Sequence, residues 1–270
     1  MIADPEIDVV VVASPSEQHS VMATAALEHG KHTLVEIPLA MTAHEAREIC
    51  DLAERKDLHL GTVHPMRMMP DMLKLHDRVA DGTEHVRLVN TTFIIKRWEN
   101  VGATGYHRSW TDNLLWHHLA HFIDFGLWLT ESPVAIVRGF MPAPDERTGT
   151  PMHAVVGAGT EAGQSLSFIG SYAGHDPVFE ALVLTDRDCY RIDAIDGTLK
   201  TRNGERPLRH EKEDCADVLR DFLAAVREER EPAVTGSKVL PSMDLMQAVQ
   251  NSWDAVYGDR PVIGRMLQPR

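Results

Sequence analysis

Ile7-Asp-Val-Val-Val-Val-Ala13 is a β-branched run with a single charged residue. Such a run is typical of a strand that is buried on both faces, as in a parallel sheet. Ser14-Pro15-Ser16 ends the run, and we expect a helix up to Glu28 that is capped by Gly30. The chain therefore opens with a buried strand followed by a helix.

Two further strands are expected at residues 33–36 and 59–63. The capping box Thr42-Ala-His-Glu45 begins the helix between them, and Pro70 begins another helix that ends before Gly82. Strands that alternate with helices in this way predict a doubly wound α/β sheet.

Three strands make only half of a dinucleotide-binding sheet, and a glycine-rich phosphate turn should open the other half. Gly157-Ala-Gly-Thr-Glu-Ala-Gly163 has a similar glycine spacing. The alternating residues Ser165-Leu-Ser-Phe-Ile169 predict a strand after it instead of a helix, so we interpret this segment as a hairpin. Because each βαβ unit needs about 30 residues, we expect about 60 residues to precede Met1 in the natural protein.

Beyond residue 85 the pattern changes to β segments joined by turn signals. Residues 86–95 form the first expected strand, residues 96–110 a polar loop, and a helix follows. Further strands are expected at residues 135–140, 153–159, 164–172, 178–185 and 189–193, and helices at residues 215–228 and 242–257.

The chain has 270 residues, which is enough for two modest domains. The expected fold is α/β followed by α+β. We place part of a dinucleotide-binding domain in residues 1–68. An open, mainly antiparallel β-sheet domain with flanking helices, for substrate binding and oligomerisation, occupies residues 69–270 and is closed by helices within residues 211–258.

The formal net charge of −13 argues against nucleic-acid and anionic-membrane partners. No apolar run approaches the roughly 20 residues that span a membrane, and Met1-Ile-Ala-Asp-Pro-Glu6 is not typical of a signal peptide. Three scattered cysteines indicate a reducing compartment. We therefore expect a cytoplasmic protein whose partner is a small molecule, and local arginines would have to hold an anionic substrate.

Three histidines are concentrated in Arg108-Ser-Trp-Thr-Asp-Asn-Leu-Leu-Trp-His-His-Leu-Ala-His-Phe-Ile-Asp124. We expect a helix from about Asp112, on which His117 and His121 lie one turn apart. Asp124 lies one turn further on, close enough to orient the imidazole of His121. A histidine held by a carboxylate suits general base catalysis near neutral pH. A separate core stripe at helical spacing consists of Leu115, Leu119, Phe122 and Gly126.

The His117-x-x-x-His121 spacing also occurs at zinc sites. No glutamate stands beside His117, and no third ligand has a recognisable spacing. A third interpretation leaves one histidine hydrogen-bonded in the core and the other solvated. We favour the acid–base role and expect no metal.

Arginines are candidates for binding substrate carboxylates, because a guanidinium binds a carboxylate bidentately. Arg108, directly before Ser109-Trp110, is the strongest candidate, and the others are Arg67 and Arg97. Ser14-Pro15 and Glu36-Ile37-Pro38 stand at the carboxyl ends of predicted strands, where open α/β sheets bind ligands. These segments are equally compatible with simple strand ends.

Several segments resemble the glucose–fructose oxidoreductase/inositol dehydrogenase (Gfo/Idh/MocA) superfamily. They are Asp4-Pro-Glu-Ile-Asp-Val-Val-Val-Val-Ala-Ser-Pro-Ser-Glu-Gln-His19, Ala26-Leu-Glu-His-Gly-Lys-His32, Val35-Glu-Ile-Pro-Leu39 and Arg230-Glu-Pro-Ala-Val-Thr-Gly236. The resemblance implies an N-terminal nicotinamide-binding Rossmann domain, of which this chain carries the C-terminal half, and an open β-sheet domain. It also implies cofactor contacts by Ser14, Pro15, His19, Glu36, Ile37 and Pro38.

Two positions depart from the superfamily pattern. Most members have Glu-Lys-Pro, with a catalytic lysine, where this chain has Glu36-Ile37-Pro38, and most have aspartate where this chain has His117. The Glu-Ile-Pro-Leu motif and residues 108–121 are similar to one branch, the 4-carboxy-2-hydroxymuconate-6-semialdehyde dehydrogenases. That branch implies NADP-dependent oxidation of a hemiacetal from protocatechuate degradation to 2-pyrone-4,6-dicarboxylate.

The resemblance implies a role for each residue of the histidine stretch. His121, or else His117, would take the proton of the hemiacetal hydroxyl, and Asp124 would orient the histidine. The cofactor would be NADP, with NAD as the alternative. The anionic substrate would be held by Arg108, Arg67, Arg97, Trp110 and His118.

Two other functions stay open. The chain would act as a ligand-binding or dimerising module if it does not bind the cofactor, or as a metal-dependent hydrolase if His117 and His121 hold a metal. An open sheet offers a broad face for self-association, so we expect a homodimer or a higher homo-oligomer.

Overall fold

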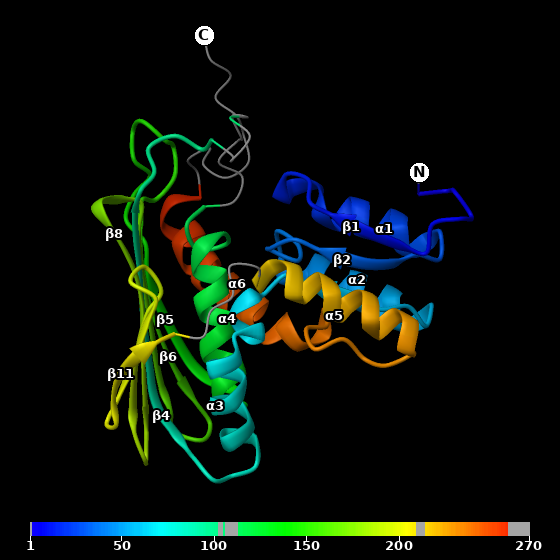
Figure 1. The fold of residues 1–270 in the computed structure, drawn as a ribbon. Coiled ribbons are helices and arrows are strands. Elements are labelled where there is room, and N and C mark those ends of the chain that lie inside the picture. The colour runs from blue at the N-terminus through cyan, green and yellow to red at the C-terminus, as the bar shows by residue number, and fades with distance from the viewer. Residues whose placement is uncertain (1, 102–104, 106–112, 209–213, 259–270) are drawn as a thin grey trace.

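A computed structural model describes residues 2–101, 105, 113–208 and 214–258 of the chain. Two sheets with helices between and around them make up the molecule (Figure 1). This arrangement confirms the expected fold class of a parallel α/β unit followed by a mainly antiparallel sheet. The first sheet has three parallel strands in the order β1 (Val9–Val12), β2 (His32–Val35) and β3 (Leu60–Thr62).

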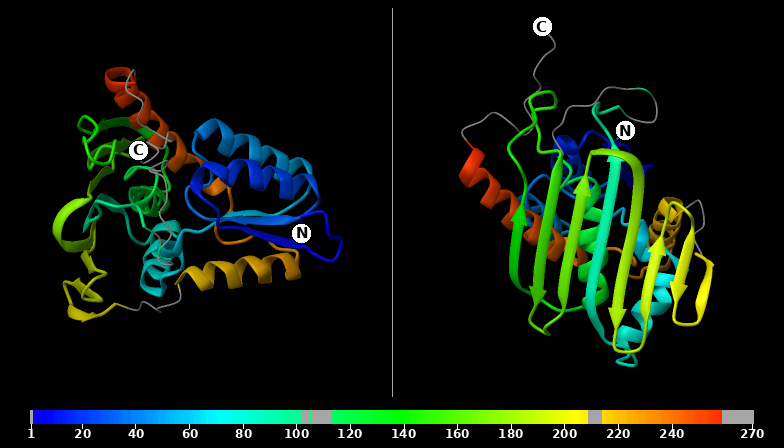
Figure 2. Two further views of the ribbon diagram at one scale, coloured as in Figure 1. Left: turned by 90° about the horizontal axis from the view of Figure 1, so that it is seen from above. Right: turned by 90° about the vertical axis from the view of Figure 1, so that its left-hand side faces the viewer.

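Helices α1 (His19–Glu28) and α2 (Ala43–Arg55) lie together on one face of this sheet (Figure 2). The predicted capping box begins α2, since the backbone N–H of Glu45 donates to Oγ1 of Thr42 over 3.1 Å. Gly30 follows α1 with φ +75°, a conformation that favours glycine. Both predicted helix boundaries are therefore confirmed.

Helix α5 (Asp214–Glu228) covers the opposite face of the first sheet (Figure 2). Its residues Val218 and Phe222 form a cluster with Leu34 and Val63. A Cβ at Gly61 would lie 2.8 Å from the ring of Phe222, so only glycine admits this packing. We had expected this helix to belong with the second sheet, but the apolar face of α5 covers the first.

The second sheet has eight strands in the order β11-β10-β9-β8-β4-β7-β6-β5. β4 runs parallel to β7, and the other neighbours are antiparallel. β6 and β7 form the hairpin that we predicted from the glycines of residues 157–163. The strands are β4 (Val86–Lys96), β5 (Val134–Phe140), β6 (His153–Thr160), β7 (Ser165–Ser171), β8 (Ala173–Thr185), β9 (Cys189–Asp193), β10 (Thr198–Thr201) and β11 (Gly204–Pro207).

Three helices pack on one face of the second sheet: α3 (Pro70–Ala80), α4 (His118–Thr130) and α6 (Leu240–Tyr257) (Figure 1). The predicted core stripe is buried, and a Cβ at Gly126 would lie 2.8 Å from Phe168. No helix of the described residues covers the other face, where Phe140 is 66% exposed (Figure 2). Among the described helices, none is long and apolar enough to cross a membrane.

Candidate functional site

Helix α4 begins later than the sequence pattern predicted. Its first residue is His118, and His117 is the N-cap without a side-chain cap bond. Oδ1 of Asn113 accepts hydrogen bonds from the backbone N–H of Leu115 over 2.9 Å and from that of Trp116 over 3.3 Å. Because an asparagine side chain that bonds to local backbone holds a turn instead of a helix, the predicted start near residue 112 is wrong.

His121 lies one turn into α4 with a partly buried ring. Its Nδ1 is buried and has no hydrogen-bond partner, and its ring meets that of His64 edge to face with centroids 5.7 Å apart. Burial, followed by the nearby His64 and His117, lowers the pKa of His121 to about 3. His121 is therefore neutral near pH 7 and can accept a proton.

Asp124 does not hydrogen-bond to His121, although both residues lie on α4. Its carboxylate accepts hydrogen bonds from Nε and Nη2 of Arg67 over 2.7 and 2.6 Å and from Oγ of Ser242 over 3.1 Å. Nδ1 of His64 lies 3.3 Å from Oδ2. The expected orienting bond to His121 is therefore absent from the described contacts, because an arginine 57 residues away takes the carboxylate.

Burial raises the pKa of Asp124, but Arg67 and His64 outweigh burial and hold it below its usual value. Asp124 is therefore ionised and forms a buried ion pair with Arg67, whose side chain is 6% exposed. The expectation that Arg67 is a free clamp for substrate carboxylates is corrected by this pairing, since two of its three nitrogens serve Asp124.

His64 is a site residue that sequence reasoning missed. It is the second residue after β3, and its side chain is 6% exposed. Burial lowers its pKa to about 4, against the opposing charge of Asp124. The available signal was its place at the carboxyl end of a predicted strand, the same position that marked Ser14 and Glu36.

His118 and Arg97 meet on the sheet side of α4. Nδ1 of His118 lies 2.6 Å from the hydroxyl of Tyr172, and its ring stacks on Phe93 with centroids 4.4 Å apart. Nη1 of Arg97 lies 3.5 Å from the same nitrogen, and its guanidinium lies 5.5 Å from the Tyr172 ring centre. Burial lowers the pKa of His118, which identifies a neutral, packed histidine.

His117 is partly exposed and meets His118 edge to face with ring centroids 4.2 Å apart. His117, His118 and His121 thus lie at one end of α4, as the sequence predicted, and His64 joins them from β3. Arg108 and Trp110, which we expected to bind substrate, lie outside the described residues. No group of three or more metal-binding side chains is found among the described residues.

The turns after β1 and β2 are joined by His19, which is 1% exposed. Its Nδ1 lies 2.6 Å from the carbonyl oxygen of Pro38, and its Nε2 lies 3.0 Å from that of Ser14. The Ile37–Pro38 peptide bond is cis. One imidazole therefore brings the predicted cofactor segments into a single edge at the carboxyl ends of the strands.

Ile37 is 7% exposed and offers no proton at the position where the superfamily has a lysine. The hydroxyl of Thr62, at the end of β3, is buried without a hydrogen bond among the described residues. An edge with fixed turns and an unused hydroxyl fits the part of a dinucleotide that lies over these strands. Among the described residues, no glycine-rich turn joins a strand to a helix to cradle a pyrophosphate.

Two family models match the chain. One is described as an oxidoreductase family with an NAD-binding Rossmann fold and matches residues 1–64. The other describes the C-terminal domain of bacterial oxidoreductases and matches residues 70–199. Neither model describes a hydrolase.

Two curated relatives match over most of the chain. A 4-carboxy-2-hydroxymuconate-6-semialdehyde dehydrogenase of Sphingobium sp. is 27% identical over 253 residues, which is 88% of this chain and 76% of the relative. An uncharacterized oxidoreductase of Escherichia coli, YdgJ, is also 27% identical, over 90% of this chain and 78% of its own.

Solved structures share the fold. UDP-N-acetylglucosamine 3-dehydrogenase of Acidithiobacillus ferrooxidans superposes with a TM-score of 0.79 at 19% identity, over 92% of this chain and 78% of its own. The WlbA dehydrogenase of Bordetella pertussis, solved with NADH and UDP-GlcNAcA, superposes with a TM-score of 0.78 at 18% identity. The match covers 95% of this chain and 79% of the WlbA chain.

Proposed function

The chain belongs to the Gfo/Idh/MocA family of oxidoreductases with an NAD-binding Rossmann fold, and from this premise we propose a specific dehydrogenase reaction. The substrate is the cyclic hemiacetal of an anionic semialdehyde, 4-carboxy-2-hydroxymuconate semialdehyde. The product is the lactone 2-pyrone-4,6-dicarboxylate, and the reaction belongs to protocatechuate degradation. The name of the Sphingobium relative supports this substrate.

The proposal rests on two positions: Ile37 is apolar, and His121 has a partly exposed ring within the histidine cluster. Oxidation of a hemiacetal to a lactone removes one proton from the hydroxyl and one hydride from the carbon that bears this hydroxyl. A bound nicotinamide supplies the hydride acceptor. Ile37 has no group that takes the proton, whereas His121 has a partly exposed imidazole, so we assign His121 as the general base.

Nδ1 of His121 is buried, so the partly exposed side of the ring is the one that carries Nε2. We assign the proton transfer to Nε2, with the hydrogen of the resting ring on Nδ1. The charge of Asp124 favours the protonated form of His121, against burial. Asp124 therefore stabilises the imidazolium from a distance instead of through the direct bond that the spacing suggested.

His117, at the mouth of the helix, is the second candidate base. The substrate is anionic, so cations should surround it, and we keep Arg97 and His118, with Arg108 and Trp110 outside the described residues, as substrate-binding residues. The edge formed by Ser14, Pro15, His19, Glu36, Ile37 and Pro38 is the proposed cofactor contact, with NADP preferred over NAD.

Self-association through the uncovered face of the second sheet completes the proposal. Exposed apolar side chains on this face include Phe140 and Val155, which are paired across β5 and β6. A face of this kind marks an interaction surface, and we propose a homodimer or a higher homo-oligomer. The three free cysteines suit the reducing cytoplasm.

One experiment tests the reaction and separates it from a binding module. Purified protein is mixed with the semialdehyde and NADP or NAD, and reduced nicotinamide is followed by its absorbance. Turnover that His121→Asn lowers by about 10² to 10⁴ supports the assignment. If the protein binds NADPH but does not turn over the semialdehyde, the proposed substrate is wrong. If it binds neither nucleotide, a ligand-binding module is the better function.

A further inference from the structure

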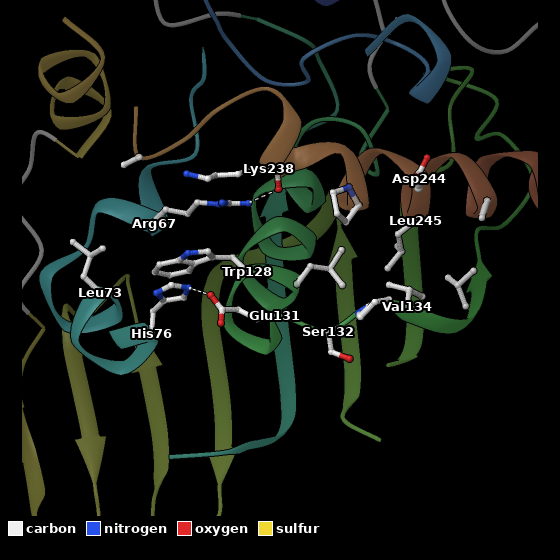
Figure 3. A pocket seen from close by; sticks show the side chains of 16 residues that line it. Arg67, Leu73, His76, Trp128, Glu131, Ser132, Val134, Lys238, Asp244 and Leu245 are labelled. Atoms are coloured by element: carbon white, nitrogen blue, oxygen red, sulfur yellow. Dashed lines mark hydrogen bonds and ion pairs between the residues drawn. The ribbon is translucent and has the colours of Figure 1, made fainter. Parts of the chain in front are cut away.

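A cavity of about 1020 Å³ opens at the other end of α4, away from the histidine cluster (Figure 3). Its walls come from α3, the C-terminal end of α4, β5 and α6, together with Arg67 from the segment after β3. None of His64, His117 and His121 lines it. The cavity is thus separate from the proposed active site, yet Arg67 reaches both.

One wall is flat and aromatic. The rings of Trp128 and His76 stack with centroids 4.3 Å apart and planes 8° apart, and Figure 3 shows Trp128 between His76 and Arg67, whose Cζ lies 5.9 Å from the Trp128 ring centre. The other walls are mostly apolar, with Leu127, Val137 and Leu245 among them. Such a pocket suits a planar apolar group, because burial against apolar and aromatic side chains favours it.

One donor atom beside this wall lacks a hydrogen bond among the described residues. Arg67 donates from Nε and Nη2 to Asp124 and from Nη2 to the carbonyl oxygen of Lys238, but Nη1 makes no bond. Nε2 of His76, by contrast, lies 2.9 Å from Oε1 of Glu131. A guanidinium nitrogen without a partner gains from an acceptor.

The charges at the rim are paired with one another. Glu131 pairs with His76, Asp244 with Arg47, and Lys238 with Glu231. Because both acids of the cavity already have a basic side chain within ion-pair distance, a cationic ligand gains little here. The free donors of Arg67 instead favour a carbonyl or carboxylate oxygen.

We propose that this cavity is a second ligand site, which takes a planar, largely apolar molecule with one carboxylate or carbonyl group. The ring system lies against Trp128 and His76, and the oxygen accepts from Nη1 of Arg67. The site requires no nicotinamide and no semialdehyde, so it stands or falls independently of the proposed reaction.

The test uses 2-naphthoate, a planar carboxylate, and isothermal titration calorimetry on the full chain. We expect saturable binding to one site per chain, and roughly tenfold weaker binding of the uncharged 2-naphthylmethanol, because Arg67 loses its charge-assisted bond. Equal affinity for the two probes overturns the role of Arg67.

Variants then locate the site. Ala248→Trp on α6 and Val137→Trp on β5 fill the cavity from two sides. Each should weaken the binding of 2-naphthoate at least about tenfold. The matched control is Ser252→Trp, one turn along α6 at an exposed position outside the lining, which should leave affinity unchanged. Far-ultraviolet circular dichroism confirms that each variant folds.

Two outcomes overturn the site. Binding that survives both filling variants places 2-naphthoate elsewhere, for example on the uncovered sheet face, and Phe140→Ser would then abolish it. Absence of any saturable binding to the wild-type chain overturns the proposal as well.

Discussion

The two ends of helix α4 contrast in how they are built. The N-terminal end carries His117, His118 and His121 within five residues, and burial lowers the pKa values of His118 and His121. The C-terminal end carries few polar groups of its own and becomes a cavity only through side chains from α3, β5 and α6. The first end offers proton acceptors, and the second offers shape and a hydrogen-bond donor.

Asp124 and Arg67 stand between these two ends. Asp124 acts on His64 and His121 through its charge, and Arg67 presents its remaining donor to the cavity. The contrast teaches that one buried ion pair sets the electrostatics of one region and the ligand chemistry of another. Changes that affect both regions should therefore have larger effects than changes confined to one.

The largest effect is expected from Asp124→Asn, which leaves the Arg67 charge buried without a partner. A broken buried pair costs about 3–5 kcal/mol, and we expect that loss in the free energy of urea unfolding. Asp217→Asn is the control, because it removes a pair with Arg220, whose side chain is 59% exposed, and a surface pair is worth at most about 1 kcal/mol. Similar losses in both variants would show that Asp124 does not join the two ends.

His121→Asn separates the ends. We expect kcat for the proposed oxidation to fall by about 10² to 10⁴ because the general base is lost, while the affinity for 2-naphthoate stays at the wild-type value. His44→Asn, at an 81% exposed side chain, serves as the surface control. A loss of less than about tenfold in kcat would remove His121 as the base.

The pH dependence of stability sharpens the description of the N-terminal end. The pKa values of His64 and His121 are lowered in the folded state to about 4 and about 3. In the unfolded chain a histidine has a pKa of about 6.5. Below that pH the unfolded chain therefore binds more protons than the folded chain. The stability is therefore fully present above pH 6.5 and falls as the pH drops towards 4, by an amount on the order of a few kcal/mol.

His64→Phe should flatten this dependence, because it removes one of the histidines whose pKa is lowered and keeps a ring against His121. Urea unfolding of both proteins between pH 7 and pH 4.5 measures the difference. Asp124 does not interfere, since its pKa is lowered and its contribution is lost only below this window. Identical slopes for the two proteins would contradict the depressed pKa of His64.

The smallest effect belongs to Glu131→Gln at the cavity. The Glu131 side chain is 46% exposed in its pair with His76, and exposed pairs contribute at most about 1 kcal/mol. We expect a change in unfolding free energy within that limit and unchanged stacking of His76 on Trp128. A larger loss would show that the rim charges, and not the aromatic wall, hold the cavity open.

Local patterns predicted much of this molecule. The β-branched run before Ser14 and the capping box at Thr42 placed β1 and α2, because both signals depend on neighbours in sequence. The histidine cluster was visible for the same reason. The strands β10 and β11 were missed because they are short and polar, with no apolar alternation to mark them.

Long-range pairing was not predictable from such signals. The spacing on α4 pointed Asp124 towards His121, but the carboxylate bonds to Arg67, which comes from another part of the chain. A lone histidine after a strand, like His64, has no partner in the sequence that would identify it. The cavity at Trp128 forms only where four elements come together, so no local sequence pattern predicts it.

The placement of α5 has a consequence for synthesis on the ribosome. The three strands of the first sheet come long before α5 in the chain, and Val218 and Phe222 of α5 belong to the cluster that buries Leu34 and Val63. One face of the sheet therefore stays open to water until more than 200 residues have emerged. Contacts of such long sequence separation form slowly, so the nascent chain needs protection from aggregation over that interval, and a truncation before residue 214 would leave it exposed for good.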